Sequence, residues 1–222
     1  MQGRVSNVNK LKIAITKGRL LDKSAEMFER AGIECGALRN PGRQLVLPVG
    51  DGAMEAVLAK APDVITYVEH GVCDLGIVGK DTIIEHATNL YEILDLGFGR
   101  CRFAVAGPRD TDFFTCGDRR VVATKYINVS KRYLEKKQID AELIKIDGSV
   151  ELAPLLGLSD VIIDIVETGS TLKANGLEIL EEVCPISARL VVNTAALKLR
   201  KKEIEELTAK IAIAAAEMEK KK

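Results

Sequence analysis

The stretch from Val161 to Leu172, VIIDIVETGSTL, decides the fold class of this chain. Its first half is a nearly continuous apolar run, which is typical of a strand buried in the middle of a sheet. Its second half passes through Thr168-Gly169-Ser170-Thr171, small polar residues that favour a turn followed by the start of a helix. A buried strand that passes directly into a helix is the repeating unit of α/β proteins.

The same alternation continues on both sides of this stretch. Apolar runs predict further strands at residues 11–15, 45–49, 74–79, 103–107, 121–124, 143–146 and 190–192. Apolar spacings of three and four predict helices from Leu21, from Pro62, over 82–88, after caps at Asn128 and Ser149, and from Ala196 onward. We therefore expect an α/β protein with mostly parallel sheets, a boundary near residues 97–99, and a surface loop at 109–120.

Length and composition exclude several classes of protein. The 222 residues are enough for one large domain or two small ones, and 47% apolar with 29% charged residues excludes wholesale disorder. Lys plus Arg and Asp plus Glu both number 32, and aromatic residues make up only 4%, so a nucleic-acid partner is not expected. We also expect no membrane span and no signal peptide, because long apolar runs are missing, and this predicts a cytoplasmic protein.

The cysteines and histidines do not suggest a metal or nucleophile site. The five cysteines are odd in number and no two have the spacing of a CxxC pair, so we expect reduced, mostly buried thiols. His70 and His86 lie far from any cysteine pair, which makes a structural metal site improbable.

The end of the stretch at 161–172 carries the strongest chemical signal. Small residues let backbone N–H groups surround an anion, and the Thr and Ser hydroxyls add further donors at the start of a helix. Asp164 and Glu167 are placed to accept hydrogen bonds from sugar hydroxyls or to help hold Mg²⁺. This combination suits a phosphoribosyl diphosphate, although a strand-to-helix turn with ordinary caps would have the same residues.

Three further clusters follow predicted strands. Lys17 and Arg19 flank Gly18 at residues 16–20, a glycine-rich segment covers 74–81, and Lys125 lies within 123–128. Basic residues at the carboxyl end of a strand suit a second anionic group such as a triphosphate, but each cluster is also compatible with a solvated or capped turn.

Four ordered segments give the chain a close resemblance to a known family. KGRL, YVEHGVCDLGIVGKD, ATKYINVSKRYLEKK and GSVELAPLLGLSDVIIDIVETGSTLKANGLEIL resemble the ATP phosphoribosyltransferases, and the resemblance extends from Leu11 to about Asn193. It implies an enzyme that joins ATP to phosphoribosyl diphosphate with Mg²⁺, releases diphosphate, and opens histidine biosynthesis. The implied enzyme would be a glycosyltransferase of the pentosyltransferase class.

The resemblance also implies an architecture and a partner. The expected fold has two α/β lobes like a type II periplasmic binding protein, with mixed or parallel sheets and the active site in the cleft. Lobe I would comprise residues 1–97 plus 181–222, and lobe II residues 98–180. Only about 28 residues follow Thr194, which fits the short form of the family. The short form implies a regulatory subunit resembling histidyl-tRNA synthetase and a homodimer within a hetero-octamer.

Individual roles are likewise implied by the resemblance. The residues assigned to phosphoribosyl diphosphate are Asp164, Glu167, Thr168, Gly169, Ser170, Thr171 and Glu151. The residues assigned to ATP or the diphosphate are Lys17, Gly18, Arg19, Asp74, Gly76, Gly79, Asp81 and Lys125, with Lys60 and Arg102 as weaker candidates. No catalytic acid or base is assigned, and Mg²⁺ is expected to bind through the substrate diphosphate.

Two departures and three alternatives accompany this interpretation. Ile127 stands where relatives commonly have proline, and the register of Arg39, Arg43 and Lys60 against the family's basic residues is insecure. The alternatives are a phosphoribosyltransferase that uses a free base, a non-catalytic sensor of small anions, and a structural interaction protein. The KGRL and GIVGKD segments favour the ATP-using enzyme over the first of these.

Overall fold

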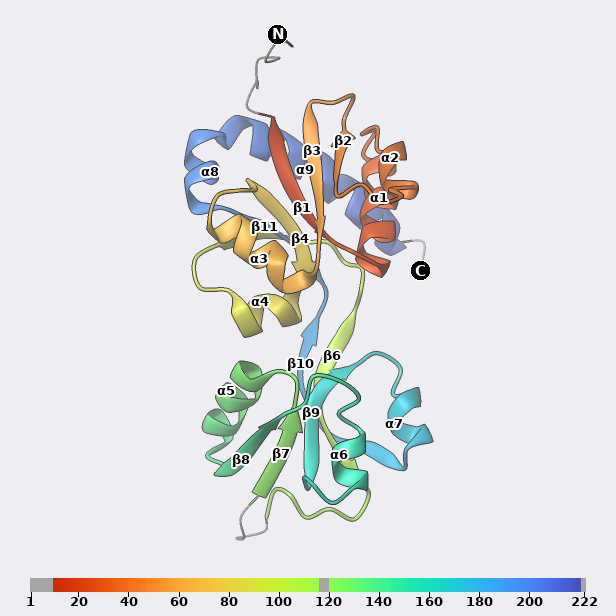
Figure 1. Ribbon diagram of the computed structural model, residues 1–222, viewed down its shortest axis with the longest axis vertical. Coiled ribbons are helices and arrows are strands. Elements are labelled where there is room, and N and C mark those ends of the chain that lie inside the picture. Colours follow the sequence, from red (N-terminus) through yellow and green to blue (C-terminus); the bar gives the residue numbers. More distant parts are fainter. Residues whose placement is uncertain (1–9, 116–119, 221–222) are drawn as a thin grey trace. The chain divides into compact units, whose positions relative to one another are not determined.

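The chain folds into two compact units, seen in the computed structural model of Figure 1, which describes residues 10–115 and 120–220. The first unit runs up to Gly99 and resumes at Ser187, and the second runs from Arg100 to Ile186. The second boundary lies six residues beyond the expected position, because residues 181–186 complete a strand of the second unit. The expectations for residues 1–9, Cys116 and residues 221–222 concern residues outside this description.

The sheet of unit 1 has the strand order β2-β3-β1-β4-β11-β5. At its centre β1 pairs in parallel with β3 and β4, whereas β2, β11 and β5 join by antiparallel pairing. The strands are β1 (Leu11–Thr16), β2 (Val46–Val49), β3 (Met54–Ala59), β4 (Leu75–Gly79), β5 (Tyr91–Asp95) and β11 (Ala188–Val192). The helices are α1 (Arg19–Arg30), α2 (Gly36–Arg39), α3 (Ala61–Glu69), α4 (Lys80–His86), α8 (Thr194–Leu199) and α9 (Lys201–Lys220).

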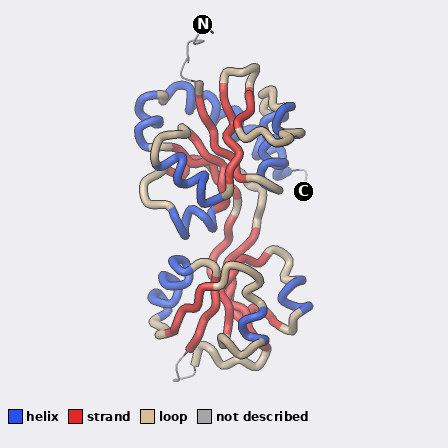
Figure 2. Tube along the Cα trace, viewed as in Figure 1, coloured by secondary structure: helices blue, strands red, loops and turns tan. Residues whose placement is uncertain are grey.

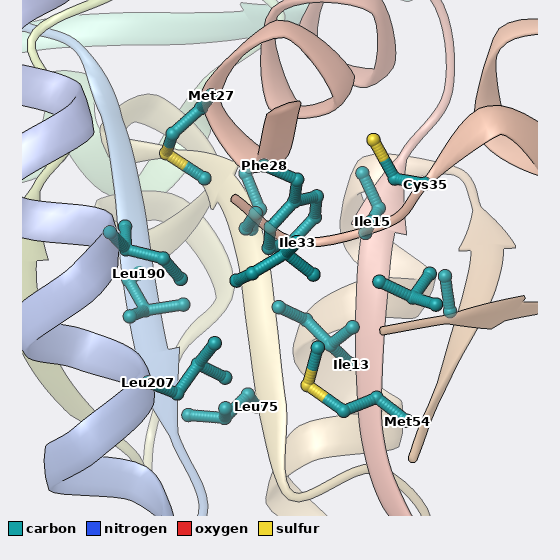
Figure 3. Packing of buried hydrophobic residues seen from close by; sticks show 14 of the residues in the cluster. Ile13, Ile15, Met27, Phe28, Ile33, Cys35, Met54, Leu75, Leu190 and Leu207 are labelled. Carbon is teal, nitrogen blue, oxygen red and sulfur yellow. The ribbon is translucent and has the colours of Figure 1, made fainter. Parts of the chain in front are cut away.

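Helices cover both faces of this sheet, because β1 is apolar on both sides. Ile13 and Ile15 point into a core shared with α1, α2 and α9, part of which is drawn in Figure 3. Ala14, which lies between them, points to the opposite face and packs in the cluster that contains α3 and α4. Unit 1 is therefore a helix–sheet–helix sandwich with two separate cores.

The sheet of unit 2 has the strand order β10-β6-β9-β7-β8. The strands β9, β7 and β8 are parallel to one another, and β6 runs antiparallel to both β9 and β10. The strands are β6 (Cys101–Pro108), β7 (Arg120–Thr124), β8 (Ala141–Lys145), β9 (Val161–Val166) and β10 (Leu177–Ile186). The helices are α5 (Ile127–Lys137), α6 (Leu152–Leu155) and α7 (Ser170–Ala174).

Unit 2 repeats the layered arrangement. Ala153 of α6 and Leu172 of α7 pack on one face of the sheet, and Tyr133 and Leu134 of α5 pack on the other. Figure 2 shows the strands running through the middle of each unit with the helices outside them. The α/β class expected from the sequence is confirmed.

Three details that the residue pattern predicted differ from the structure. The sheets are mixed, since four of the nine strand pairings among the described residues are parallel and five are antiparallel. Asn128 and Ser149 do not cap their helices: α5 begins after Tyr126, and α6 begins after Glu151. The expected loop at 109–120 also buries Phe113 and ends at the first residue of β7.

Three strands have no counterpart in the sequence analysis, namely β3, β5 and β10. The sequence of β3, MEAVLA, consists mostly of good helix formers, and only pairing between β1 and β2 makes it a strand. The sequence of β10 contains Pro185, which would interrupt a central strand. Because β10 lies at the edge of its sheet and pairs only with β6, the proline is tolerated there.

The cysteines agree with the expectation in part. All four that the structure describes are free thiols; Cys35 and Cys73 are buried, whereas Cys101 and Cys184 are half-buried. Burial raises the pKa of the Cys73 thiol to about 11, so this cysteine stays protonated at neutral pH. A protonated, buried thiol is a poor nucleophile.

Candidate functional site

The carboxyl ends of three parallel strands meet at one edge of the sheet in unit 2. The strand register aligns Thr124 of β7 with Ile163 of β9 and Lys145 of β8. The loops that follow these strands therefore emerge side by side, and they carry Lys125, the 167–169 turn and the half-buried Glu151. In parallel sheets, ligands bind at this edge.

The turn between β9 and α7 is built to expose polar groups. Gly169 has φ 78° and ψ 7°, a left-handed conformation that glycine adopts without strain, and it directly precedes α7. The Thr168 and Ser170 hydroxyls lie 3.0 Å apart, and the Ser170 N–H donates to Thr168 Oγ1 at 3.3 Å. Thr168, Ser170 and Thr171 are exposed, whereas Leu172 is buried and anchors the turn to the core. The turn thus presents hydroxyls and N–H groups of a helix start to solvent.

Acidic and basic groups flank this turn. Asp164 is half-buried near the end of β9, and Glu167 is exposed one residue after the strand. Arg102 of β6 is aligned with Val166, and its Nη1 donates to the Glu167 carbonyl at 3.4 Å. The Arg102 Nε also forms an ion pair with Glu182, whose carboxylate oxygen lies 2.6 Å away. Arg102, a weaker candidate in the sequence analysis, is therefore a direct neighbour of the turn.

Lys125 lies on the neighbouring loop of the same edge. Its side chain is exposed and makes no ion pair with another described residue. The next residue, Tyr126, packs its ring edge-on against buried Phe103, with ring centroids 4.9 Å apart. The lysine is thus mounted on an anchored loop and its charge is not neutralised by a nearby described carboxylate.

A second edge of the same kind forms in unit 1, where β1, β3 and β4 are parallel. Lys17, Gly18 and Arg19 follow β1 directly, and the Lys17 N–H donates to the Ala59 carbonyl at the end of β3 at 3.0 Å. Gly18 has φ 82° and ψ −146°, a conformation open essentially to glycine alone. Its carbonyl accepts the Leu21 N–H at 2.8 Å and so starts α1. Lys60 follows β3 and immediately precedes α3.

The end of β4 contributes an acidic group to this edge. Gly79 precedes α4, and a Cβ atom placed on it would lie 2.0 Å from Oδ1 of Asp81. The Asp81 side chain therefore folds back over Gly79, and the Thr82 hydroxyl donates to its Oδ2 at 3.2 Å. Lys80 between them pairs with Glu92 and is already neutralised.

The structure does not bring Asp74 and Gly76 to this edge. Asp74 precedes β4 at the opposite edge of the sheet, where its Oδ2 accepts the Lys12 N–H at 2.8 Å and Arg200 Nη1 at 3.1 Å. Gly76 is buried within β4, and a Cβ atom there would approach Val68 and Val191 to 2.9 and 3.0 Å. Both residues serve the packing of unit 1.

The Asp74 contact belongs to a structural ion-pair cluster. Arg200 also binds Glu203, with its Nη2 2.6 Å from Oε2. The hydrogen bond from Arg200 lowers the pKa of Glu203, and the bond with Glu203 raises the pKa of Arg200 against a smaller opposing effect of burial. The cluster joins α8 and α9 to the start of β4 and already engages the Asp74 carboxylate.

The described residues contain no ready-made metal centre. Within residues 10–115 and 120–220, no group of three or more His, Cys, Asp or Glu side chains is arranged to hold a metal ion. Asp164 and Glu167 supply two carboxylates near the turn between β9 and α7. That donor set suits Mg²⁺ held mainly by substrate phosphates, because Mg²⁺ keeps several waters and takes few protein ligands.

Comparison with known proteins identifies the class first. The periplasmic aliphatic sulphonate binding protein SsuA from Escherichia coli aligns with a TM-score of 0.59 over 93% of this chain and 68% of that one, at 15% identity. At that identity the likeness concerns the fold alone, and it places the chain among proteins with a type II periplasmic-binding-protein-like fold, as the family resemblance implied.

The family follows from closer relatives. A family model described as HisG: ATP phosphoribosyltransferase matches residues 60–213. An ATP phosphoribosyltransferase of Clostridium kluyveri is 54% identical over 211 residues, which make up 95% of this chain and 96% of that protein. The ATP phosphoribosyl transferase (HisG:HisZ) complex from Thermotoga maritima aligns with a TM-score of 0.79 and 33% identity, over 93% of this chain and 99% of that one. The chain belongs to the ATP phosphoribosyltransferase family, and its match to relatives of this length fits the short form.

The remaining expectations concern a membrane span, the family resemblance and the roles of single residues. In the portion of the chain that is described, none of the helices combines the length and apolar character needed to cross a membrane. The resemblance drawn from the four sequence segments is confirmed, whereas the roles of individual residues stay predictions.

Thr124 is a residue that the sequence analysis overlooked. The sequence does carry a signal for it: the dipeptide Thr-Lys occurs twice where a predicted strand ends, as Thr16-Lys17 and as Thr124-Lys125.

Proposed function

We propose that this chain catalyses the first step of histidine biosynthesis, in which N1 of the ATP adenine displaces diphosphate from phosphoribosyl diphosphate. Membership of the ATP phosphoribosyltransferase family supports this proposal. The observation that carries it is the β9–α7 turn, where exposed hydroxyls and helix-start N–H groups follow directly on Asp164. Phosphoribosyl diphosphate requires this combination of a phosphate cradle and a carboxylate for sugar hydroxyls.

In the proposed complex, the turn binds the 5-phosphate. Its N–H groups and the hydroxyls of Thr168, Ser170 and Thr171 would donate to the phosphate oxygens. Asp164, and with it Glu167, would accept hydrogen bonds from the ribose hydroxyls, and Glu151 would add a polar contact from the next loop but one. Arg102, which is itself paired with Glu182, would hold the turn through its bond to the Glu167 carbonyl.

The proposed ATP and diphosphate contacts come from the other loops described above. Lys17, Arg19 and Lys125 would bind anionic oxygens, and Gly18 would let the backbone approach the ligand closely, whereas Gly79 leaves room for the Asp81 side chain. Asp81 would accept hydrogen bonds at the end of β4. The proposal does not extend to Asp74 and Gly76, because the ion pair of Asp74 and the packing around Gly76 already account for them.

The chemistry requires positioning more than proton transfer. A bond forms between adenine N1 and ribose C1 as the bond from C1 to the diphosphate oxygen breaks, and the electron pair leaves with the diphosphate. Since N1 carries a free lone pair at neutral pH, no general base is needed. The side chains named above would align the two substrates and stabilise the negative charge that develops on the leaving group.

Mg²⁺ is the proposed cofactor. When bound it would neutralise charge on the diphosphate and make it a better leaving group. The substrate's own phosphate oxygens would be its principal ligands, and Asp164 and Glu167 would supply the protein carboxylates.

We further propose a cytoplasmic enzyme that works with a regulatory subunit. The HisG:HisZ complex of Thermotoga maritima supports such a partner for this chain. A homodimer of the catalytic chain within a hetero-octamer is the assembly that we propose.

The test measures diphosphate release from ATP, phosphoribosyl diphosphate and Mg²⁺, with the full chain alone and with the regulatory subunit added. We expect release that requires both substrates. Asp164→Asn should lower kcat/KM by about a hundredfold, because it removes the charge that binds the ribose hydroxyls while keeping the side-chain shape.

Asp160→Asn is the matched control, since Asp160 directly precedes β9 at the opposite edge of the sheet. Its Oδ2 accepts the Val121 N–H at 2.7 Å, and an amide oxygen can still accept that bond. Equal losses in both variants would contradict the proposed site. Binding of phosphoribosyl diphosphate without turnover, with the regulatory subunit present, would contradict the enzyme and favour the sensor.

A further inference from the structure

We propose that Thr124 is a positioning residue of the active site, which fixes the loop of Lys125 against the strand that carries Asp164. This inference rests on the proposed function, because it assigns Lys125 to binding the diphosphate group. Thr124 is completely buried and cannot touch a substrate itself. Its effect would pass through the lysine next to it.

The Thr124 hydroxyl makes all the hydrogen bonds that a hydroxyl can make, one as a donor and two as an acceptor. It donates to the Ile163 carbonyl at 2.6 Å, and it accepts the Tyr126 N–H at 2.9 Å and the Ser130 hydroxyl at 3.1 Å. A hydroxyl has one donor and two acceptor positions, so all three are occupied. Networks that are fully satisfied and buried hold their members in a single geometry.

The three bonds connect the structural elements on which the site depends. The Tyr126 N–H belongs to the peptide bond that follows Lys125, so this bond fixes the backbone on the carboxyl side of the lysine. Ile163 directly precedes Asp164 in β9, and Ser130 is buried in the first turn of α5. The hydroxyl therefore ties the lysine loop to the strand of the proposed ribose carboxylate and to the helix that follows.

The same device occurs in unit 1. Thr16 is the last residue of β1, its hydroxyl donates to the Ile77 carbonyl of the parallel strand β4 at 3.0 Å, and Lys17 follows it. In both units a threonine ends a strand, bonds across to the neighbouring parallel strand, and is followed by an exposed lysine. Neither lysine makes an ion pair with another described residue, so in each case the anchored loop presents a charge that remains available.

The test combines single variants with a double-mutant cycle in the full chain. Thr124→Val keeps the side-chain shape and removes the hydroxyl, whereas Thr124→Ser keeps the hydroxyl. The Kd of inorganic diphosphate with Mg²⁺ is measured by titration calorimetry, and kcat and the KM of phosphoribosyl diphosphate are measured with the regulatory subunit present. We expect Thr124→Val to raise the Kd and the KM about tenfold, and Thr124→Ser to stay within about threefold of the wild type.

The double variant Thr124→Val/Lys125→Ala separates positioning from a purely structural role. If the threonine acts through the lysine, removing it from a protein that already lacks the lysine side chain should change the Kd by no more than about twofold. A double variant whose loss equals the product of the two single losses would overturn the proposal. An unchanged Kd in Thr124→Val or in Lys125→Ala would overturn it as well.

Ser24→Ala controls for the loss of a buried hydroxyl elsewhere. Ser24 is also completely buried, and its hydroxyl donates to the Leu20 carbonyl within α1 at 2.6 Å. This variant should lower the thermal midpoint without raising the Kd of diphosphate. Should Thr124→Val fail to fold, Ser130→Ala removes only one of the three bonds and is expected to raise the Kd about threefold. A wild-type Kd in that variant would then overturn the proposal.

The two proposals fail separately. A wild-type chain that binds diphosphate but never releases it from the two substrates contradicts the proposed function, while the binding titrations still decide the role of Thr124. A normally active enzyme in which Thr124→Val changes nothing contradicts only the role of Thr124.

Discussion

Glu69 shows how a single carboxylate can make part of the stability depend on pH. Burial raises the pKa of this carboxyl, but hydrogen bonds from Asn89 and Thr88 outweigh burial and hold the pKa below its ordinary value. Its Oε1 accepts the N–H groups of Thr88 and Asn89 at 2.5 and 2.7 Å and the Thr88 hydroxyl at 3.1 Å. One carboxylate oxygen therefore closes the loop between α4 and β5.

Glu69→Gln should remove this pH dependence. Because the folded pKa lies below the unfolded one, the carboxylate stabilises the fold fully above the ordinary carboxyl range, and this contribution is lost as the pH falls through the folded pKa. We expect the variant to be less stable than the wild type by about 1 kcal/mol at pH 7, with the difference shrinking in acid. Urea denaturation between pH 7 and 3 measures it. Thr88→Val, which leaves both N–H bonds in place, should keep most of the dependence, and a constant difference at every pH would contradict the explanation.

Gly76 is a second residue whose role is decided by packing. An added Cβ atom would lie 2.9 Å from Val68 Cγ2 and 3.0 Å from both Val191 Cγ2 and Val64 Cγ1. All three are buried, branched side chains, so they have little room to move.

Gly76→Ala should therefore destabilise unit 1 by about 1–3 kcal/mol, as expected for overpacking a core. Gly148→Ala is the matched control, because a Cβ atom at Gly148 would meet nothing within 4 Å. Denaturation midpoints of the two variants provide the measurement. Equal stability of Gly76→Ala and the wild type would show that the contacts around β4 yield easily.

At the scale of elements, α9 is held by one face only. Ile204, Leu207, Ile211 and Ala214 are buried in the core of Figure 3, as their spacing of three and four residues along a helix predicts. Ile213, two residues from the buried Ile211, is 65% exposed, because side chains two apart on a helix point in different directions.

This contrast makes a direct test of how α9 is fixed. Ile211→Ala should cost about 2–5 kcal/mol through lost burial and a cavity, whereas Ile213→Ala should change stability by less than about 0.5 kcal/mol. Both variants make the same chemical change in the same helix, so helix propensity cancels in the comparison. Urea denaturation followed by circular dichroism measures both, and equal losses would mean that α9 does not pack through its predicted face.

At the scale of the whole molecule, two units with separate cores are made from an interleaved chain. Each of the four hydrophobic clusters draws its residues from one unit only. Unit 1 nevertheless needs β11, α8 and α9 from the end of the chain, because β11 lies between β4 and β5 in its sheet. The first unit therefore cannot be completed before the second has been synthesised.

The sequence alone determined the fold class of this protein, most of its helices and strands, and its family. Nearly continuous apolar runs such as 161–166 and helical spacings such as that of 204–211 are local patterns, and they were sufficient to predict the α/β class and most elements. Ordered segments likewise identified the family. The turns at Gly18 and Gly169 were found because a left-handed backbone favours glycine wherever it occurs.

Only the tertiary structure decided the direction of strand pairing, the strands β3, β5 and β10, and the partners of single side chains. The residues of β3 and β10 have weak or opposing local preferences, and pairing with neighbours far along the chain overrides them. Asp74 follows the same rule: its pairing with Arg200, 126 residues away, is invisible in the sequence around it. The Thr124 hydroxyl and the Ile163 carbonyl meet only because β7 and β9 pair in register, since a hydrogen bond depends on distance in space and not along the chain.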